Sequence, residues 1–349
     1  MIEPAGFYSG RTVLVTGGTG FIGRHIVELL LAQSAHVVVP VHKRPLPLEF
    51  SGVDAPTADL TRPEDCLRVT RGVDYVFHAA GAVAGAGVPA AGAMTSIVTN
   101  LVLTARILEA AWTNRVRRCL VFSSSTAYPA LEHPVREEEM WSGAPEACYV
   151  GYGWMRRYLE MLSEFVSRQS SVQVAIVRPT AVYGRHDDFE PATSHFVPAL
   201  VRRAVERAQP FDVWGTGDET RDLLHVTDLA RGCLIALEKH ACADPINIGY
   251  GASIRVRDVV RVILDAAGYR DAAVVFHPGR PGTIRSRTVD CGKAREVLGF
   301  QASRTLEEGI GDTVRWYREA SSRVAATVAG NWHQQESRRF RQLLLDERR

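Results

Sequence analysis

The sequence predicts an α/β protein built on a doubly wound parallel sheet, followed by a smaller region. Three observations support this fold class. Over the first 180 residues, short runs rich in β-branched residues alternate with amphipathic stretches, and the centres of the short runs are nearly continuously apolar. A glycine-rich segment joins the first such run to the first amphipathic stretch. Apolar strands separated by helices are typical of a parallel sheet that helices cover on both faces.

Each expected strand is a run of valine, isoleucine and neighbouring apolar residues. Five such runs occupy residues 12–16, 36–41, 74–80, 118–124 and 172–178. Each expected helix carries apolar residues three and four positions apart. Such stretches lie at residues 21–33, 95–112 and 152–168. The alternation predicts one domain over residues 1–180.

After residue 180 the alternation weakens. A polar connection at 184–195 precedes an expected helix at 196–208, and shorter elements follow at 246–251, 256–268 and 273–278. Doubly wound sheets bind ligands outside the carboxyl ends of their strands, so we expect a substrate-binding region, 181–320, to pack there. Residues 321–349 are expected to form a charged helical tail.

The composition excludes several classes of protein. The chain has 349 residues and a formal net charge of only +2, which argues against a nucleic-acid partner. We expect no membrane segment, since no apolar run approaches the ~20 residues that a spanning helix needs. The amino-terminal residues lack the pattern of a secretory signal, which predicts a cytoplasmic protein. The six cysteines are scattered without a Cys-x-x-Cys pair, so we expect reduced thiols and no metal site.

The glycine-rich segment predicts a dinucleotide site of the Rossmann type. Gly17, Gly20 and Gly23 follow the first strand and open the first helix, together with Phe21 and Ile22. Glycines in this position allow a tight turn and a close approach of the backbone to a pyrophosphate. The amino-terminal end of the helix then faces the phosphates with its positive dipole.

The end of the second strand indicates which dinucleotide binds. A carboxylate there would bind ribose hydroxyls, whereas a cation would accept a 2′-phosphate. The sequence has His42, Lys43 and Arg44, and no carboxylate before Glu49. We therefore favour NADP(H) over NAD(H); the alternative interpretation is a solvated basic loop.

Two further segments are expected to line the cofactor. Asp59 and Leu60 follow a segment expected to be a strand and are placed to bind adenine. His78, Ala79 and Ala80 end the strand at 74–80, where small residues would let the backbone lie along the cofactor. His78 has an alternative interpretation as a core histidine, and we do not assign it a catalytic role.

Together these segments resemble the extended short-chain dehydrogenase/reductase superfamily, also described as the NAD-dependent epimerase/dehydratase family. The resemblance covers about residues 10–320 and rests on the glycine loop, the segment His-Ala-Ala, the serine-rich strand end at 122–129 and the tyrosine of the helix at 152–168. Within the superfamily, residues 179–203 and 212–230 are most similar to the GDP-L-fucose synthase group. That group epimerises a GDP-4-keto-6-deoxymannose and reduces it with NADPH.

The resemblance implies a role for particular residues. Ser124 falls on the catalytic serine and Tyr152 on the catalytic tyrosine, while His195 falls on the acid/base of epimerisation. Arg156 takes the place of the catalytic lysine. Tyr152, Arg156 and Pro179 would also contact the cofactor. The residues expected to contact the nucleotide sugar are Ser125, Thr126, Arg203, Trp214 and Arg221.

Three positions depart from the pattern of the group. Thr126 replaces a cysteine that shares in epimerisation, Ala181 replaces an asparagine, and Arg156 replaces the lysine. An arginine keeps the charge that stabilises a tyrosinate, but its pKa is too high for it to pass a proton onward. We therefore expect a slower or differently routed proton supply.

The sequence thus predicts an NADPH-dependent 4-ketoreductase of an NDP-4-keto-6-deoxyhexose, with weak or absent epimerisation. One alternative is an NDP-sugar 4-epimerase or dehydratase that recycles its nicotinamide. Another is a catalytically weak sensor that binds NADP. The resemblance also implies a homodimer formed through two helices that flank the sheet, and it favours GDP as the carrier.

Overall fold

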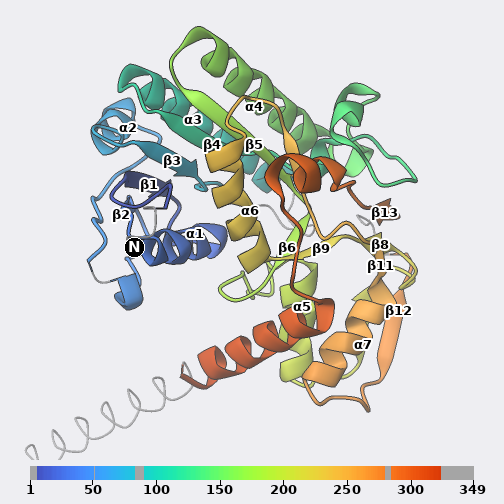
Figure 1. Ribbon diagram of the computed structural model, residues 1–349. Helices are drawn as coiled ribbons and strands as arrows, with labels where there is room; N and C mark the ends of the chain where they lie inside the picture. The colour runs from blue at the N-terminus through green and yellow to red at the C-terminus, as the bar shows by residue number, and fades with distance from the viewer. Residues whose placement is uncertain (1–5, 51, 83–89, 280–283, 324–349) are drawn as a thin grey trace, which may run out of the picture.

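The computed structural model describes residues 6–50, 52–82, 90–279 and 284–323. Its centre is a six-stranded sheet in which all neighbouring strands are parallel, in the order β10-β5-β4-β3-β1-β2 (Figure 1). The strands are β1 (Thr12–Thr16), β2 (His36–Val38), β3 (Tyr75–His78), β4 (Arg118–Phe122), β5 (Gln173–Pro179) and β10 (Ile246–Ile248). The predicted Rossmann-like fold class is confirmed.

Helices cover both faces of this sheet (Figure 1). On one face α1 (Phe21–Ala32) packs against α6 (Val226–Lys239), and on the other α3 (Ala90–Thr113) packs between α2 (Pro63–Val69) and α4 (Val150–Gln169). Side chains alternate between the two faces of a strand. In β1, Val13 and Val15 therefore join the core under α1 and α6, while Leu14 joins the core under α3.

A smaller layer carries the remaining elements. Its helices are α5 (Phe196–Val205), α7 (Val256–Ala266) and a helix described from residue 306 to 323. Its strands form three small sheets: β6 (Ala181–Tyr183) with β9 (Leu223–His225), β7 (Phe211–Trp214) with β12 (Val274–His277), and β8 (Thr220–Arg221) between β11 (Ile254–Arg255) and β13 (Ser286–Arg287). Short helical turns complete the fold: η1 (Leu48–Phe50), η2 (Ser125–Ala127), η3 (Glu137–Trp141), η4 (Ala147–Tyr149) and η5 (Ala294–Leu298).

The chain after residue 180 contributes to both layers, because α6 and β10 join the main sheet. The division at residue 180 therefore stays a prediction about folding units. Of the expected charged tail at 321–349, only the first three residues lie in the described part of the chain.

Two expectations about strands need correction. The strand expected at 36–41 ends at Val38, and Pro40 supplies no N–H for a ladder. The segment before Asp59, expected to be a strand, makes only isolated bridges, from Val38 to Asp54 and from Val41 to Thr57.

The expectation that the chain has no long apolar segment also needs correction. By length and composition alone, Ala93–Thr113 of α3 could cross a membrane, which is weak evidence because core helices pass the same test. The expectation that no segment is long and apolar enough missed it. In the fold, this helix contacts β3, β4, α2 and α4.

Candidate active site

The glycine segment packs directly against the end of β3. Gly17 has φ +69°, and a Cβ atom there would lie 2.7 Å from the carbonyl carbon of Ala79 and from the amide nitrogen of Ala80. A Cβ at Gly23 would lie 2.2 Å from the carbonyl oxygen of Gly17. Glycine is therefore required at both positions, and two segments expected to line the cofactor lie in contact.

The first turn of α1 is left free for an anion. Gly20 caps the helix without a side-chain hydrogen bond, and no acidic residue lies in the first turn. The first N–H groups of a helix have no partner within it, and the helix dipole favours negative charge there. The turn formed by Gly17 to Gly23 thus fits the pyrophosphate of a dinucleotide.

The residues expected to select the cofactor lie on the surface. His42, Lys43 and Arg44 are exposed and make no ion pair or hydrogen bond within the described residues. Asp59 is half-buried and its Oδ1 atom accepts hydrogen bonds from the backbone N–H of Thr61 (3.0 Å) and from its hydroxyl (2.8 Å), which lower the pKa of the carboxyl group. Leu60, beside it, is buried.

His78 has both ring nitrogens occupied. Nδ1 lies 2.8 Å from the hydroxyl of Thr16, and Nε2 lies 3.2 Å from the hydroxyl of Thr104. Burial, aided by the charge of Arg156, lowers the pKa of His78 to about 3, so the ring is neutral. These contacts support the interpretation of His78 as a core histidine, and its contact with the cofactor stays a prediction.

Tyr152 and Arg156 meet at the carboxyl end of β4. Both lie near the start of α4, four residues apart and therefore on one face of the helix. Nη2 of Arg156 donates to the phenol oxygen of Tyr152, and Nη1 donates to the carbonyl oxygen of Phe122 at 2.8 Å. The guanidinium carbon lies 4.8 Å from the centroid of the Tyr152 ring. The arginine thus fixes the phenol to the end of the neighbouring strand.

Ser124 lies in the turn that follows β4. Its hydroxyl oxygen accepts hydrogen bonds from the backbone N–H of Thr126 (3.2 Å) and from the hydroxyl of Thr126 (2.9 Å). A hydroxyl oxygen has two lone pairs, and both are used by these bonds, so the hydroxyl hydrogen of Ser124 remains available for donation. The turn lies against α4, because a Cβ at Gly153 would lie 3.0 Å from the carbonyl oxygen of Thr126. Ser124 is therefore a hydrogen-bond donor beside the helix of Tyr152.

The structure adds Arg287 to the site, which sequence reasoning missed. It is only 6% exposed; Nη1 donates to the carbonyl oxygen of Ser125 (2.9 Å) and Nη2 to the carboxylate of Glu146 (2.8 Å). Its register neighbour is Arg221, which lies within electrostatic reach of Tyr149 and Glu146 and whose pKa is lowered by burial. Two guanidinium groups therefore approach the segment before α4. Ser125 and Arg287 are 162 positions apart in the sequence, so no local pattern could have revealed this contact.

Other expected site residues lie in the smaller layer. His195 is exposed and caps α5. Arg203 donates to the carbonyl oxygen (2.5 Å) and the carboxylate (3.1 Å) of Asp212, which fixes α5 to β7. Trp214, at the end of β7, is 39% exposed. Pro179 is buried at the end of β5, so it lies at the same edge of the main sheet as the glycine segment.

A comparison with known families decides the class of the protein. The model of the NAD-dependent epimerase/dehydratase family matches residues 13–249. The chain belongs to this family. It is an NAD(P)-dependent enzyme of the extended short-chain dehydrogenase/reductase type, which confirms the resemblance seen in the sequence. The family binds a nicotinamide cofactor, and the binding of that cofactor at the glycine segment of this chain stays a prediction.

Similar members of the family include two sugar-modifying enzymes. The dTDP-4-dehydro-6-deoxy-D-allose reductase of Streptomyces bikiniensis is 29% identical over 321 residues, which cover 89% of this chain and 97% of the relative. The GDP-L-fucose synthase of Escherichia coli (strain K12) is 30% identical over 265 residues, covering 72% of this chain and 82% of the relative.

Two solved structures of the family share the fold closely. UDP-glucose 4-epimerase of Thermotoga maritima, determined with UDP-glucose, superposes with a TM-score of 0.79 at 27% identity over 88% of this chain and 99% of that one. MoeE5 in complex with UDP-glucose and NAD superposes with a TM-score of 0.75 at 29% identity, over the same shares of the two chains.

Proposed function

We propose that this enzyme reduces the 4-keto group of an NDP-4-keto-6-deoxyhexose with NADPH. The observation that carries the proposal is the pairing of two proton donors at the carboxyl end of β4. Tyr152 is held there by Arg156, and Ser124 has only its proton left to donate. A ketone oxygen that becomes an alkoxide needs such donors. The reductase and the synthase among its relatives both act on sugar nucleotides, as their names state.

In this reaction Ser124, Tyr152 and Arg156 would have different roles. When bound, the reduced nicotinamide supplies the hydride that C4 of the sugar receives. Ser124 donates a hydrogen bond to the carbonyl oxygen, and Tyr152 gives it the proton. Arg156 stabilises the phenolate that remains, but a guanidinium does not lose its own proton, so the phenol is reprotonated from elsewhere.

Arg221 supports an anionic substrate. It approaches the segment just before α4 from the smaller layer, and a guanidinium group suits phosphate oxygens. Its neighbour Arg287 is already engaged by Glu146 and by the carbonyl of Ser125, so it fixes this side of the site. We assign the diphosphate of the nucleotide sugar to this side of the site and, following the sequence resemblance, favour GDP as the carrier.

Epimerisation at C3 and C5 is expected to be weak or absent. The family group uses a cysteine where this chain has Thr126, and the Thr126 hydroxyl donates to Ser124 at 2.9 Å. A hydroxyl engaged in this way is a poor base. Turnover in D2O is therefore expected to leave C3 and C5 largely without deuterium, and deuterium at both carbons would contradict this assignment.

NADP(H) is the proposed cofactor because three basic side chains are exposed after β2. Lys43→Glu with Arg44→Glu should weaken NADPH binding while leaving NADH binding little changed. Equal affinity of the unaltered enzyme for both cofactors would refute the preference.

A panel of 4-keto-6-deoxy sugar nucleotides tests the reaction itself. Absorbance of NADPH should fall in proportion to product, and Tyr152→Phe should abolish this loss while retaining NADPH binding. Turnover without loss of NADPH would indicate an epimerase or a dehydratase; one structural relative is named as an epimerase. Binding of NADPH with no turnover would indicate a sensor.

We also propose that the enzyme is a homodimer. Large apolar side chains lie exposed on the outer faces of α3 and α4, and exposed patches of this kind are typical of interfaces. They are Met94, Val98, Trp112, Trp154, Tyr158, Met161 and Phe165. Sedimentation of the purified enzyme should show a dimer, and Phe165→Glu should shift it towards the monomer.

A further inference from the structure

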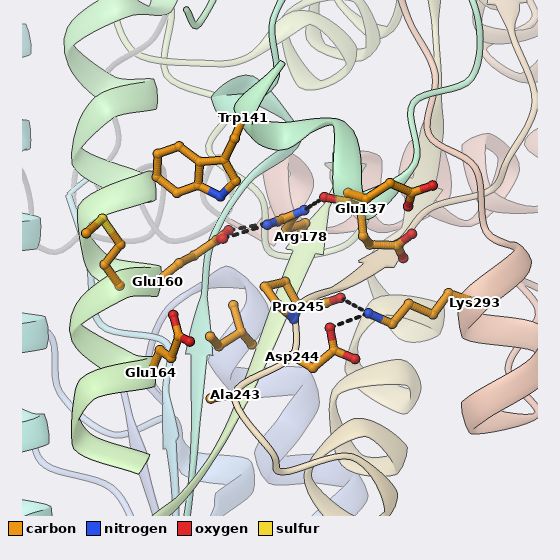
Figure 2. A pocket seen from close by; sticks show the side chains of 12 residues that line it. Glu137, Trp141, Glu160, Glu164, Arg178, Ala243, Asp244, Pro245 and Lys293 are labelled. Carbon is orange, nitrogen blue, oxygen red and sulfur yellow. Dashed lines mark hydrogen bonds and ion pairs between the residues drawn. The ribbon is translucent and has the colours of Figure 1, made fainter. Parts of the chain in front are cut away.

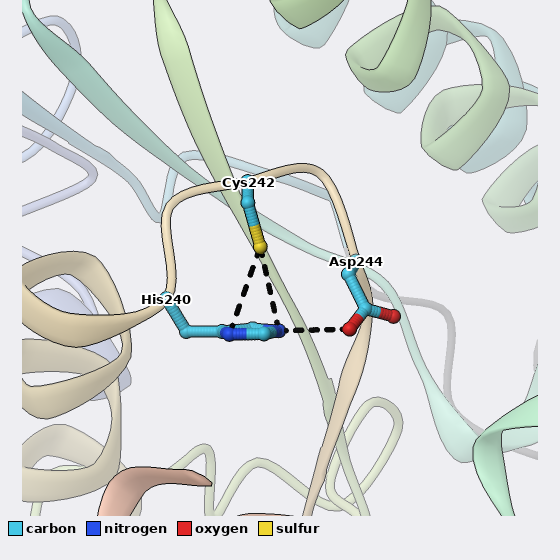
Figure 3. A group of neighbouring side chains, drawn as sticks. All are labelled: His240, Cys242 and Asp244. Atoms are coloured by element: carbon cyan, nitrogen blue, oxygen red, sulfur yellow. Dashed lines mark hydrogen bonds and ion pairs between the residues drawn. The ribbon is translucent and has the colours of Figure 1, made fainter.

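A second group of reactive side chains lies between α6 and β10, away from the proposed active site. His240 caps the carboxyl end of α6, and Cys242 and Asp244 follow it in the loop that leads to β10 (Figure 3). Nε2 of His240 lies 3.0 Å from Oδ2 of Asp244, and Sγ of Cys242 lies 3.6 Å from both ring nitrogens. The three potential ligand atoms thus lie within 4.8 Å of one another.

The cavity next to this loop is less suited to binding an ion. It has a volume of about 260 Å³ and lies between α4, η3 and the loop (Figure 2). Its charged groups already have partners: Glu160 accepts two hydrogen bonds from Arg178 (2.8 and 2.6 Å), and Glu137 accepts one from the backbone N–H of Asn247 (2.8 Å). The exposed loop beside it carries the stronger candidate site.

We propose that His240, Cys242 and Asp244 form a zinc-binding site. Zinc takes imidazole nitrogen, thiolate sulfur and carboxylate oxygen as ligands, whereas calcium and magnesium prefer oxygen alone. Donor atoms around a tetrahedral zinc ion are roughly 3.3–3.7 Å apart. Two of the separations in this loop, 3.0 and 3.6 Å, are close to those values, and all three donor atoms lie within 4.8 Å of one another.

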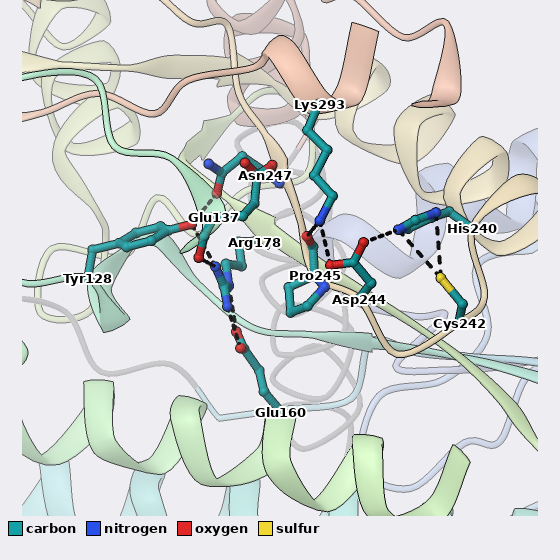
Figure 4. A network of polar contacts seen from close by, with 10 residues as sticks. All are labelled: Tyr128, Glu137, Glu160, Arg178, His240, Cys242, Asp244, Pro245, Asn247 and Lys293. Carbon is teal, nitrogen blue, oxygen red and sulfur yellow. Dashed lines mark hydrogen bonds and ion pairs between the residues drawn. The ribbon is translucent and has the colours of Figure 1, made fainter. Parts of the chain in front are cut away.

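Lys293 holds the carboxylate in a suitable orientation. Its ammonium group donates to Oδ1 of Asp244 (2.5 Å) and to the carbonyl oxygen of Pro245 (2.8 Å), as Figure 4 shows. The other oxygen, Oδ2, is thereby turned towards His240. Partners of this kind orient metal ligands and are important for affinity.

Binding would change the protonation of two ligands. Zinc takes the place of the hydrogen between Nε2 of His240 and Oδ2 of Asp244. That hydrogen moves to Nδ1 of the neutral ring, so this ligand changes tautomer without releasing a proton. The thiol of Cys242 loses its proton to solvent and its sulfur turns from the face of the ring towards the metal, which an exposed side chain can do. A water molecule completes the four ligands.

The bound ion would join the end of α6 to the start of β10. Both elements belong to the main sheet layer, so zinc would stabilise the folded state in proportion to its occupancy. The sequence led us to expect no metal site, because it has no Cys-x-x-Cys pair and we saw no histidine at metal-ligand spacing. This loop instead combines a histidine, a cysteine and an aspartate at alternate positions.

Protection of thiols provides a direct test. Of the six cysteines, Cys148 and Cys242 are exposed and the other four are buried. Metal-free enzyme is treated with iodoacetamide with and without zinc, and alkylation at each site is measured by mass spectrometry. Zinc should slow alkylation of Cys242 at least tenfold and leave Cys148 unaffected. Equal protection of both thiols, or of neither, would overturn the proposal.

Variants then identify the ligands. Calorimetric titration should show one zinc per chain, and His240→Gln or Cys242→Ser should weaken binding on the order of 100-fold. Cys148→Ser, which removes the other exposed thiol, should bind zinc like the unaltered enzyme. Cobalt should give a thiolate-to-metal absorption band that Cys242→Ser abolishes. A Cys242→Ser enzyme that binds zinc as tightly as the unaltered one would refute the assignment.

Discussion

Replacing Arg156 tests whether its positive charge supports proton donation by Tyr152, as we propose in place of the usual lysine. In Arg156→Met the charge next to the Tyr152 phenol is lost, while the length of the side chain is largely kept. The guanidinium donates directly to the phenol oxygen, where the charge of a phenolate would lie. At an effective dielectric constant of 20, a unit charge about 4 Å from that oxygen contributes about 4 kcal/mol to a phenolate, before desolvation is counted. If this stabilisation is realised in the transition state, the turnover number should fall up to ~1,000-fold.

Arg156→Lys is the matched control, because it keeps the charge and loses the forked geometry. An ammonium group on a shorter side chain cannot reach both the phenol oxygen and the carbonyl oxygen of Phe122 as the guanidinium does. We expect a loss of less than tenfold in turnover, with the KM for NADPH little changed. The substitution should also lower the free energy of unfolding, measured in urea, by about 1–3 kcal/mol, because the carbonyl oxygen of Phe122 loses its charged donor.

The assay follows NADPH absorbance with the 4-keto sugar nucleotide that turns over fastest. The reasoning fails if Arg156→Met retains most of its turnover, since the charge would then not contribute. It also fails if the lysine variant is as slow as the methionine variant. A large gain in rate with lysine would mean that the natural site is impaired and that the pocket is not built around a guanidinium.

Three further predictions concern other parts of the chain. Gly17→Ala should weaken NADPH binding at least tenfold in a fluorescence titration, because the new Cβ would lie 2.7 Å from backbone atoms at the end of β3. Burial lowers the pKa values of His25 and His225 to about 4, so the folded state stays unprotonated where the unfolded state, with pKa values near 6.5, takes up protons. The stability that these histidines contribute is therefore lost as pH falls from about 6.5 to 4, by up to ~1.4 kcal/mol per pH unit for each, and His25→Gln should flatten the dependence in urea titrations at several pH values. Arg287→Met should lower the free energy of unfolding by about 2–3 kcal/mol and reduce turnover, because it leaves the partly buried carboxylate of Glu146 without its partner.

The main sheet was predictable because its strands are buried on both faces. A strand in that position is nearly continuously apolar, so β1, with three apolar residues between two threonines, was located at residues 12–16 from its composition. The glycine segment was equally informative, since the close contacts at Gly17 and Gly23 leave no room for a side chain. Helix ends were less certain, as in α3, which begins at Ala90 and not at residue 95.

Features that depend on distant contacts could not be predicted. The helix α6 was not predicted. Its first residues belong to the segment 212–230, which we interpreted by its family resemblance and not as a helix. In the structure α6 packs on β4, β5 and α1. Likewise, the pattern around Ser124 gave no reason to expect that Thr126 would use both its backbone N–H and its hydroxyl on that serine. Such hydrogen bonds depend on the local turn, which the residue types alone do not specify.

The position of Arg287 indicates that the proposed active site depends on more than the first 180 residues. Tyr152, Arg156 and Ser124 all precede residue 180, and their hydrogen bonds lie within α4, the end of β4 and the turn that follows it. The carbonyl oxygen of Ser125, however, accepts a hydrogen bond from Arg287 in β13. The strand β13 pairs with β8, which carries Arg221. The smaller layer therefore does more than offer a surface for the substrate. A fragment ending at residue 180 would keep the phenol and its arginine, but it would lose the group that fixes the serine segment beside them.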